Sequence, residues 1–335
     1  MKPTVFIPEP IASPGVELLR RHCHCRTPWE EGITVPPEPD AEGSAPHRAA
    51  FREADAALVR LFQVDAEDIR NAPRLKVIGK HGVGTDNIDC EAATSRGLPV
   101  VFTPGSNGRT VAEHAMALML ALSRQIYPSS HAIRSGTMED RNRYQGVELA
   151  GKNLGLIGLG RIGSRVAGIA SGGFGMQVRA YDPFLPPGSA MGAAVFEESL
   201  EALLAWADFI SLHVPLSGAT RHLINQERLK LMKPGCRLVN TSRGPVIDEA
   251  ALARALREGR LAGAALDVFE EEPLPADHPL CRTPNTLLTP HISGLTDSAL
   301  ERASLMAAQG ILDVLQGRRP EHVANPGCFG NRATN

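Results

Sequence analysis

Short apolar runs recur along the chain and alternate with segments that have helical periodicity. Ten such runs, each three or four residues long, lie at Val5–Ile7, Ala57–Val59, Val77–Gly79, Val100–Phe102, Leu154–Ile157, Val178–Tyr181, Phe209–Leu212, Arg237–Asn240, Ala264–Leu266 and Leu287–Thr289. Strands that alternate with helices are typical of α/β proteins, whose parallel strands are buried on both faces. The pattern predicts an α/β fold built on parallel sheets.

Three further segments stand out. Residues Thr110–Ile126 are apolar almost all round, so we expect this helix at a domain or subunit interface and not on the surface. A last helix is expected over Asp297–Leu315, with Gly317 as its C-cap. Residues 28–46 are rich in Pro, Glu and Gly and predict a surface loop, whose role the pattern does not define.

The composition fits two globular domains. A chain of 335 residues exceeds the length at which one hydrophobic core stops growing, roughly 250 residues. The net charge is −2 and no long run of Lys or Arg occurs, which argues against a nucleic-acid partner. No segment approaches the roughly 18 apolar residues of a membrane span, and the N-terminal apolar run is too short for a signal sequence. We therefore expect a cytoplasmic protein without membrane contact.

The cysteines do not predict a metal site or a disulfide framework. All six are scattered without the paired spacing of zinc sites, so free thiols are expected. The tract His22–Cys25 resembles a ligand cluster, but adjacent residues of a strand point to opposite faces and cannot converge on one ion. No metal is predicted.

A glycine-rich turn follows the apolar run Leu154–Ile157. It has the spacing Gly158-x-Gly160-x-x-Gly163, in which the first glycine permits a tight turn, the second lets a pyrophosphate approach, and the third allows close packing of the next helix. The amino end of that helix favours the phosphate charge. A strand, this turn and a helix together predict a dinucleotide site, placed near the middle of the chain.

Asp182 lies nineteen positions after Gly163, at the end of the run Val178–Tyr181. A carboxylate at this place accepts hydrogen bonds from the adenosine ribose and repels a 2'-phosphate, which favours NAD over NADP. The alternative is an aspartate that only caps a turn before Pro183.

Polar residues follow four of the predicted strands, namely His213, Arg243, Asp267 and His291. Open α/β sheets bind their ligands beyond the carboxyl ends of the strands. Each residue alone could simply begin a solvated loop. The four together indicate one cleft.

Several motifs in a fixed order resemble the D-isomer-specific 2-hydroxyacid dehydrogenase family over nearly the whole chain. They are the segments Gly82–Asp89, Val111–Glu113, Gly158–Gly163, His213–Pro215, Thr241–Gly244, Asp267–Phe269 with Glu272 and Pro273, and Thr289–Ile292. The resemblance implies an oxidoreductase that interconverts a small 2-oxo acid and its D-2-hydroxy acid with NAD. It also implies a homodimer that pairs through the region after residue 105.

By this resemblance Arg243, Glu272 and His291 are the catalytic residues, and their chemistry suits the reaction. Arginine can hold a carboxylate and polarise a ketone with its planar fork. Histidine titrates near neutral pH and can deliver or take a proton. A glutamate bonded to that histidine would favour its charged form and hold the ring.

The fold expected from the motifs is two Rossmann-like, doubly wound parallel-sheet domains, one flavodoxin-like and one NAD-binding, with a cleft between them. The substrate-binding domain comprises residues 1–104 and 293–335, and the NAD-binding domain residues 105–292. The resemblance assigns substrate contacts to Arg60, Gly82, Val83 and Gly84. It assigns cofactor contacts to Gly158, Gly160, Arg161, Ile162, Gly163, Asp182, His213, Val214, Pro215, Thr220, Thr241, Asp267 and Gly294.

Alternatives remain at this stage. An arginine at position 60 suits a substrate with a second anionic group, as in 3-phosphoglycerate, but it could equally be a solvated or paired residue. Hydroxypyruvate and glyoxylate are the other leading candidates. A relative acting on sulfolactate, phosphite or formate, or an NAD-sensing corepressor on the same scaffold, is the competing interpretation. The sequence does not indicate the direction of the reaction.

Overall fold

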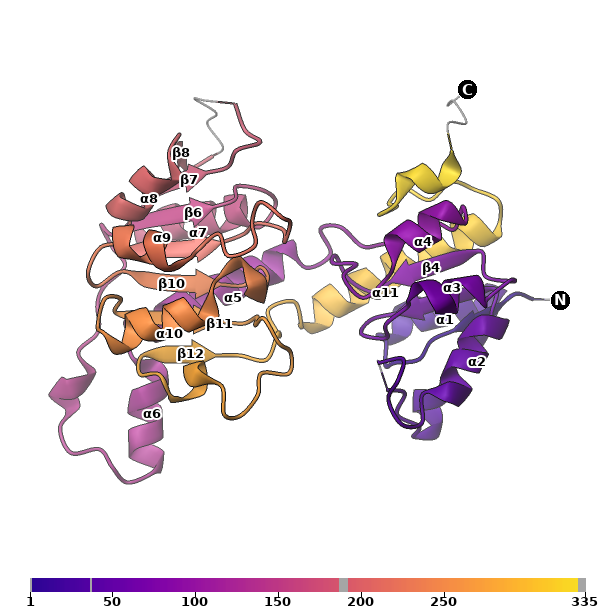
Figure 1. The fold of residues 1–335 in the computed structure, drawn as a ribbon, viewed down its shortest axis with the longest axis horizontal. Coiled ribbons are helices and arrows are strands. Elements are labelled where there is room, and N and C mark those ends of the chain that lie inside the picture. Colours follow the sequence, from indigo (N-terminus) through magenta and orange to yellow (C-terminus); the bar gives the residue numbers. More distant parts are fainter. Residues whose placement is uncertain (1, 37, 187–191, 331–335) are drawn as a thin grey trace. The chain divides into compact units, whose positions relative to one another are not determined.

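The computed structural model describes residues 2–36, 38–186 and 192–330 of the chain (Figure 1). The chain divides into two compact units. One unit, here called the discontinuous unit, comprises Met1–Asn107 and Leu295–Asn335. The other, here called the central unit, comprises Gly108–Gly294. Each unit contains one parallel sheet, so the predicted α/β class is confirmed.

The discontinuous unit has a five-stranded sheet in the order β2-β1-β3-β4-β5. This is the flavodoxin-like order, with its topological switch point between β1 and β3. Its elements are β1 (Thr4–Phe6), α1 (Ser13–His22), β2 (His24–Arg26), η1 (Pro28–Glu31), α2 (Ala45–Glu53), β3 (Ala56–Val59), α3 (Ala66–Arg70), β4 (Val77–Lys80), α4 (Cys90–Ser95), β5 (Val100–Val101), α11 (Asp297–Leu315) and η5 (Pro326–Phe329).

The central unit has a seven-stranded sheet in the order β12-β11-β10-β9-β6-β7-β8, and its switch point lies between β6 and β9. Its elements are α5 (Gly108–Ser123), α6 (Ile126–Arg134), η2 (Arg141–Tyr144), β6 (Asn153–Ile157), α7 (Gly163–Phe174), β7 (Gln177–Tyr181), β8 (Val195–Phe196), α8 (Leu200–Trp206), β9 (Phe209–Leu212), α9 (Gln226–Leu231), β10 (Arg237–Asn240), η3 (Gly244–Val246), α10 (Glu249–Arg257), β11 (Gly263–Leu266), η4 (Pro279–Arg282) and β12 (Thr286–Leu288).

Every predicted apolar run overlaps a strand of one sheet or the other. The inner strands β3, β4, β9 and β11 are buried along their whole length, because helices cover both faces of each sheet. Two strands were not predicted. Strand β2 is three residues long and mostly exposed, and β8 has two residues, so neither carries an apolar run.

The C-terminal helix α11 packs within the discontinuous unit against α1 and β4. Glycines allow the close contact: a Cβ at Gly15 would lie 2.4 Å from the carbonyl oxygen of Ser304, and a Cβ at Gly79 would lie 2.6 Å from Ile311. The helix thus covers one face of the five-stranded sheet, and its apolar side completes that core.

The predicted surface loop at 28–46 is only partly a loop. It begins with the 3₁₀ turn η1, and α2 starts at Ala45. Val35 is buried in the core of the discontinuous unit, so the segment is anchored in the middle. Nothing in its Pro-rich composition indicated this anchor, because one valine sets no periodicity.

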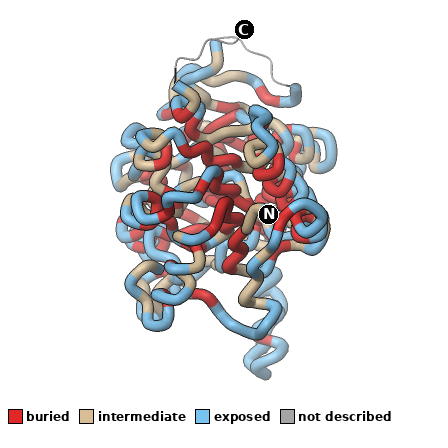
Figure 2. Tube along the Cα trace, turned by 90° about the vertical axis from the view of Figure 1, so that its right-hand side faces the viewer, coloured by how far each residue is buried: buried red, intermediate tan, exposed pale blue. Residues whose placement is uncertain are grey.

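Helix α5 is the apolar helix expected at an interface. It packs on α7, β10, β11 and β12, so much of its apolar surface is buried in the central unit's own core. Helix α6, which follows it, is largely exposed and appears mostly pale blue at the bottom of Figure 2. Among the helices of the described residues, none combines the length and the apolar character needed to cross a membrane.

Candidate active site

The glycine turn lies at the switch point of the central sheet, between the ends of β6 and β9. Gly158 has φ +91°, and a Cβ there would lie 2.5 Å from the carbonyl oxygen of His213. A Cβ at Gly163 would lie 2.2 Å from the carbonyl oxygen of Gly158, whereas at Gly160 it would meet nothing within 4 Å. Gly158 and Gly163 are therefore required for packing, whereas Gly160 leaves open space. This geometry fits the approach of a pyrophosphate.

Arg161 and Ile162 complete the turn. Arg161 is exposed, and its carbonyl oxygen accepts a hydrogen bond of 2.6 Å from Nη1 of Arg165. Ile162 is the N-cap residue of α7 and packs against the core of the central unit. The first turn of α7 contains no acidic residue, so no side-chain charge competes with a ligand anion there.

Asp182 ends β7 and lies beside the glycine turn. Its Oδ2 accepts a hydrogen bond of 3.0 Å from the backbone N–H of Leu159, and its Oδ1 accepts one of 3.0 Å from that of Phe184. The carboxylate is therefore held in one orientation. Because each carboxylate oxygen can accept more than one hydrogen bond, Asp182 keeps the capacity to receive ribose hydroxyls.

The residues after β9 contain a buried polar atom without a partner. His213 Nε2 lies 3.0 Å from Ser211 Oγ, while Nδ1 is buried and has no hydrogen-bond partner among the described residues. Burial lowers the pKa of His213 to about 4, so the ring is neutral at neutral pH. Val214 and Pro215 continue the chain, and Thr220 Oγ1 donates a hydrogen bond of 2.6 Å to the carbonyl of Pro215.

Thr241, directly after β10, also has a buried hydroxyl with no partner among the described residues. Buried polar atoms are nearly always satisfied, so unpaired ones suit a site completed by a ligand. The open glycine turn, the oriented Asp182 and these two unpaired atoms together fit a bound dinucleotide.

Arg243 is presented by a turn that Asn240 builds. Asn240 is fully buried at the end of β10, its Nδ2 donates to the carbonyl of Arg243 at 3.0 Å, and its Oδ1 accepts from the backbone N–H of Ser242 at 2.9 Å. Arg243 itself donates from Nη1 to the carbonyl of Ser242 at 2.7 Å. Asn240 was not predicted as a site residue, because it lies within a predicted strand and gives no separate signal in the sequence.

Glu272 and His291 are in direct contact. His291 Nδ1 lies 2.7 Å from Glu272 Oε2, and Glu272 Oε1 accepts a hydrogen bond of 3.0 Å from the backbone N–H of Phe269. Burial acts to raise the pKa of Glu272, but these two hydrogen bonds and the charges of His291 and Arg243 lower it below its ordinary value. Glu272 is therefore ionised at neutral pH and holds the His291 ring through Nδ1.

Asp267 holds the turn that presents His291. Its carboxylate accepts hydrogen bonds from Thr289 Oγ1 at 2.6 Å and from the backbone N–H groups of Ile292 at 2.9 Å and Ser293 at 2.8 Å. Its backbone carbonyl accepts from the N–H of His291 at 2.8 Å. The residue is fully buried. These bonds give Asp267 a positioning role for His291, and the cofactor contact expected from the sequence stays a prediction.

Gly294 follows this turn directly and is the last residue of the central unit. On the other side of Asp267, His114 Nε2 of α5 lies 3.6 Å from Asp267 Oδ1 and 3.4 Å from Thr289 Oγ1. The turn around His291 is therefore anchored to α5 as well as to β11.

Arg60 belongs to the discontinuous unit, at the end of β3. Glu9, at the end of β1, accepts hydrogen bonds from the backbone N–H groups of Arg60 at 2.6 Å and Phe62 at 2.7 Å. On the opposite side, Lys80 Nζ donates to the carbonyl of Arg60 and to Asn87. The loop is thus held on both sides at the switch point of its sheet. Glu9 was not predicted as a site residue. Because ligands bind beyond the carboxyl ends of parallel strands, its place after β1 would select it once the strand order is known.

The segment Gly82–Gly84 follows β4 in the same unit. Gly82 has φ +151° and its carbonyl accepts a hydrogen bond of 3.0 Å from the N–H of Thr103. Val83 is exposed. The segment therefore leaves backbone and an apolar side chain at the surface of the discontinuous unit.

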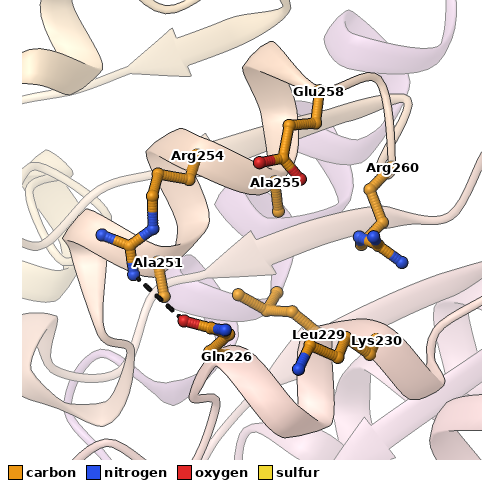
Figure 3. A pocket seen from close by; sticks show the side chains of 8 residues that line it. All are labelled: Gln226, Leu229, Lys230, Ala251, Arg254, Ala255, Glu258 and Arg260. Carbon is orange, nitrogen blue, oxygen red and sulfur yellow. Dashed lines mark hydrogen bonds between the residues drawn. The ribbon is translucent and has the colours of Figure 1, made fainter.

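A cavity of about 270 Å³ lies elsewhere on the central unit, between α9 and α10 (Figure 3). Figure 3 shows charged side chains of Lys230, Arg254, Glu258 and Arg260 around it. None of the three predicted catalytic residues lines it, and within the described residues no group of His, Cys, Asp or Glu side chains is placed to hold a metal ion.

The fold and these residues define a dinucleotide-binding α/β protein whose central unit carries an Arg–Glu–His constellation. Residues 116–293 match the NAD-binding domain of the D-isomer-specific 2-hydroxyacid dehydrogenases. The chain belongs to this family, as the sequence motifs predicted. The prediction of NAD as the cofactor is likewise supported by this domain.

Two curated relatives illustrate the similarity. A D-3-phosphoglycerate dehydrogenase of Methanocaldococcus jannaschii is 46% identical over 278 residues, which cover 82% of this chain and 52% of the relative. The chain therefore spans about half the length of that protein. A glyoxylate reductase of Thermofilum pendens is 40% identical over 330 residues, which cover 97% of this chain and 95% of the relative.

Among solved structures, a D-lactate dehydrogenase of Aquifex aeolicus in complex with NAD and lactic acid superposes with a TM-score of 0.81. The sequences are 29% identical, and the match covers 96% of this chain and 99% of that chain. The similarity extends over both units and supports the predicted pair of Rossmann-like domains.

Proposed function

We propose that the protein is an NAD-dependent oxidoreductase that interconverts a small 2-oxo acid and the corresponding D-2-hydroxy acid. The observation that carries this proposal is the contact between His291 and Glu272, with the charge of Arg243 close enough to lower the pKa of that glutamate. These three groups supply a proton donor, its orienting carboxylate and a cation for an anionic substrate. The D preference follows from the family.

The roles of the three residues follow from their chemistry. When bound, NADH would supply the hydride. His291 in its charged form donates a proton to the substrate carbonyl oxygen, and its neutral form takes the proton back in the reverse direction. Glu272 fixes the ring through Nδ1, which leaves Nε2 to carry that proton. Arg243 holds the substrate carboxylate and polarises the carbonyl.

The cofactor is proposed to bind along the carboxyl edge of the central sheet. Gly158, Gly160 and Gly163 would receive the pyrophosphate, with Arg161 and Ile162 at the start of α7, and Asp182 would receive the ribose hydroxyls. The remaining contacts are proposed from residues at the ends of β9, β10 and β11 and near His291, namely His213, Val214, Pro215, Thr220, Thr241, Asp267 and Gly294. The negative charge of Asp182 supports a preference for NAD over NADP.

The substrate is proposed to be a small anionic acid of the hydroxypyruvate, glyoxylate or 3-phosphoglycerate type. The relatives' names support glyoxylate and 3-phosphoglycerate, and Arg60 supports a second anionic group on the substrate. The rigid loop around Arg60 and the exposed segment Gly82–Gly84 would contact it. We accordingly propose that residues 1–104 and 293–335 form the substrate-binding domain and residues 105–292 the NAD-binding domain.

We further propose a homodimer located in the cytoplasm. Exposed apolar side chains on and after α6, at Ile126, Tyr127, Ile133 and Met138, support pairing through the region after residue 105. Free thiols at all six cysteines suit a reducing compartment. A molar mass in solution of twice the chain mass of 35.8 kDa is expected from light scattering, and a single chain mass would contradict the dimer.

The proposed activity is tested by mixing purified protein with NADH and each of glyoxylate, hydroxypyruvate, phosphohydroxypyruvate and sulfopyruvate. We expect NADH consumption with at least one acid, and a product of D configuration. NADH binding measured separately by fluorescence shows whether the cofactor site is intact. Binding without turnover on any of these acids would contradict the enzymatic proposal and favour a cofactor-sensing protein.

A further inference from the structure

The segment Phe269–Glu272, which carries the proposed partner of His291, is held against the turn of Arg243. Gly244 follows Arg243, and a Cβ at Gly244 would lie 1.8 Å from the carbonyl carbon of Phe269 and 2.4 Å from the backbone nitrogen of Glu270. The two backbones are therefore in close contact. A displacement of the segment would move Glu272 relative to Arg243.

A second attachment joins the same segment to the first residue of α10. Glu249 Oε1 accepts a hydrogen bond of 2.8 Å from the backbone N–H of Glu270, and Glu270 Oε1 accepts one of 3.3 Å from the backbone N–H of Glu249. Each glutamate thus binds the backbone of the other. Glu249 is buried, whereas the helix already has a separate N-cap in Asp248, whose side chain accepts from the N–H of Ala251.

Two histidines complete this arrangement. His278 Nε2 lies 3.4 Å from Glu249 Oε2, and His222 Nε2 lies 3.3 Å from Glu270 Oε1. The titratable groups that act on Glu249 are therefore Glu270, Glu272, His222 and His278. Burial, with the negative charges of Glu270 and Glu272, raises the pKa of Glu249 to about 7, against a hydrogen bond from Glu270 and the charge of His222.

We propose that Glu249 is a positioning residue for the reaction: through its reciprocal hydrogen bonds with Glu270 it fixes the segment that places Glu272 against His291. The inference rests on the proposed function, because it assumes that Glu272 and His291 act in turnover. Within the described part of the chain Glu249 makes no hydrogen bond to Glu272 or His291, and it acts through the backbone of Glu270. A helix that needed only a cap would not require a second buried carboxylate at this place.

The protonation of Glu249 adds a measurable signature. As pH rises through neutrality, Glu249 becomes charged, so the charge acting on Glu272 changes. The glutamine variant keeps an oxygen that can accept from the N–H of Glu270 but cannot ionise. The alanine variant loses both the acceptor and the charge.

Three variants test the proposal by steady-state kinetics. Each rate is divided by the number of intact active sites, which NADH binding measures. We expect Glu249→Ala to lower kcat on the order of ten- to a hundredfold with little change in the Kd for NADH. Glu249→Gln is expected to restore kcat to within about threefold, while the dependence of kcat/KM on pH loses a step near neutrality. Asp248→Ala removes the N-cap of the same helix but leaves the contact between Glu249 and Glu270 in place. We expect this variant to have a lower Tm and a kcat near the wild-type value.

The outcomes separate the two proposals. Wild-type protein that binds NADH but reduces no 2-oxo acid would refute the proposed function, and this inference with it. Active wild-type protein with an unchanged kcat in Glu249→Ala would refute the positioning role alone. The positioning role would also be refuted if Asp248→Ala and Glu249→Ala lowered kcat equally, because loosening of the helix end would then explain both losses.

Discussion

His291 places Nδ1 2.7 Å from Glu272 Oε2 while its own backbone has φ +52°. Residues other than glycine rarely adopt this conformation, and it persists where the surroundings hold it. Asp267 provides that support by accepting hydrogen bonds from the backbone N–H groups of His291, Ile292 and Ser293. The histidine is thus oriented before any ligand binds.

The Glu272→Gln substitution tests the electrostatic role of this carboxylate. The amide can still accept a hydrogen bond but no longer favours a charged imidazole, so we expect kcat/KM for oxo-acid reduction to fall on the order of a hundredfold or more. Because the variant removes the ionisable group in contact with the imidazole, the dependence of kcat/KM on pH should change as well. Glu271→Gln, an exposed neighbour, serves as the control and should retain its activity. An unchanged pH profile in Glu272→Gln would remove this glutamate from the proposed mechanism.

Asp182→Ala is expected to weaken discrimination against NADPH. Removal of one negative charge from the ribose site should raise the ratio of kcat/KM for NADPH over NADH on the order of tenfold. Asp182→Asn keeps an oxygen for the N–H of Leu159 or Phe184 and separates charge from turn structure. Cofactor preference that stays the same in both variants would leave Asp182 as a turn residue only.

Asp267→Asn should affect stability and turnover together. The buried carboxylate accepts three hydrogen bonds, and an amide replaces one accepting oxygen by a donor that faces donors. We expect a loss on the order of 1–3 kcal/mol in the free energy of unfolding and a lower kcat. Chemical denaturation and kinetics check this, with Thr289→Val as a milder control that removes a single donor. Full activity in Asp267→Asn would show that the turn around His291 does not depend on these hydrogen bonds.

The buried His81 is expected to make the stability of the discontinuous unit sensitive to acid. It is buried, its Nε2 donates to the carbonyl of Leu300 at 3.1 Å, and burial lowers its pKa to about 4 from an ordinary value of 6.5. Between these values the unfolded chain binds the extra proton and the folded protein does not. The stabilising contribution is therefore complete above pH 6.5 and is lost as the pH falls toward 4.

His81→Gln keeps a donor for the carbonyl of Leu300 and does not titrate. We expect the Tm difference between this variant and the wild type to shift in favour of the variant as pH is lowered from about 7 to 5. Scanning calorimetry at several pH values measures it. Parallel Tm curves for the two proteins would show that His81 contributes nothing to acid sensitivity.

The sequence predicted those features that depend on local pattern. The apolar runs gave the principal strands, and the spacing of Gly158, Gly160 and Gly163 located the turn at the switch point of the central sheet. Local pattern could not supply β2 or β8, because their residues are too few and too exposed to form an apolar run. Their strand pairing depends on neighbours distant in sequence.

The candidate site likewise combines residues that local pattern predicts with contacts that it does not. Motifs identified Glu272 and His291 as partners, but the supporting contacts of Glu249 and Asp267 join segments that only the folded chain brings together. Asp267 is an example. Its place after a strand marked it as a site residue, but its hydrogen bonds to Ile292 and Ser293 exist only once the chain has folded.

The most direct test of the account compares wild-type protein and His291→Ala on the same 2-oxo acid, with NADH consumption and NADH binding measured on one preparation. We predict turnover by the wild type, a loss on the order of a thousandfold or more in the variant, and NADH affinity that stays within about threefold. A variant that retains turnover would contradict the assignment of the proton to His291.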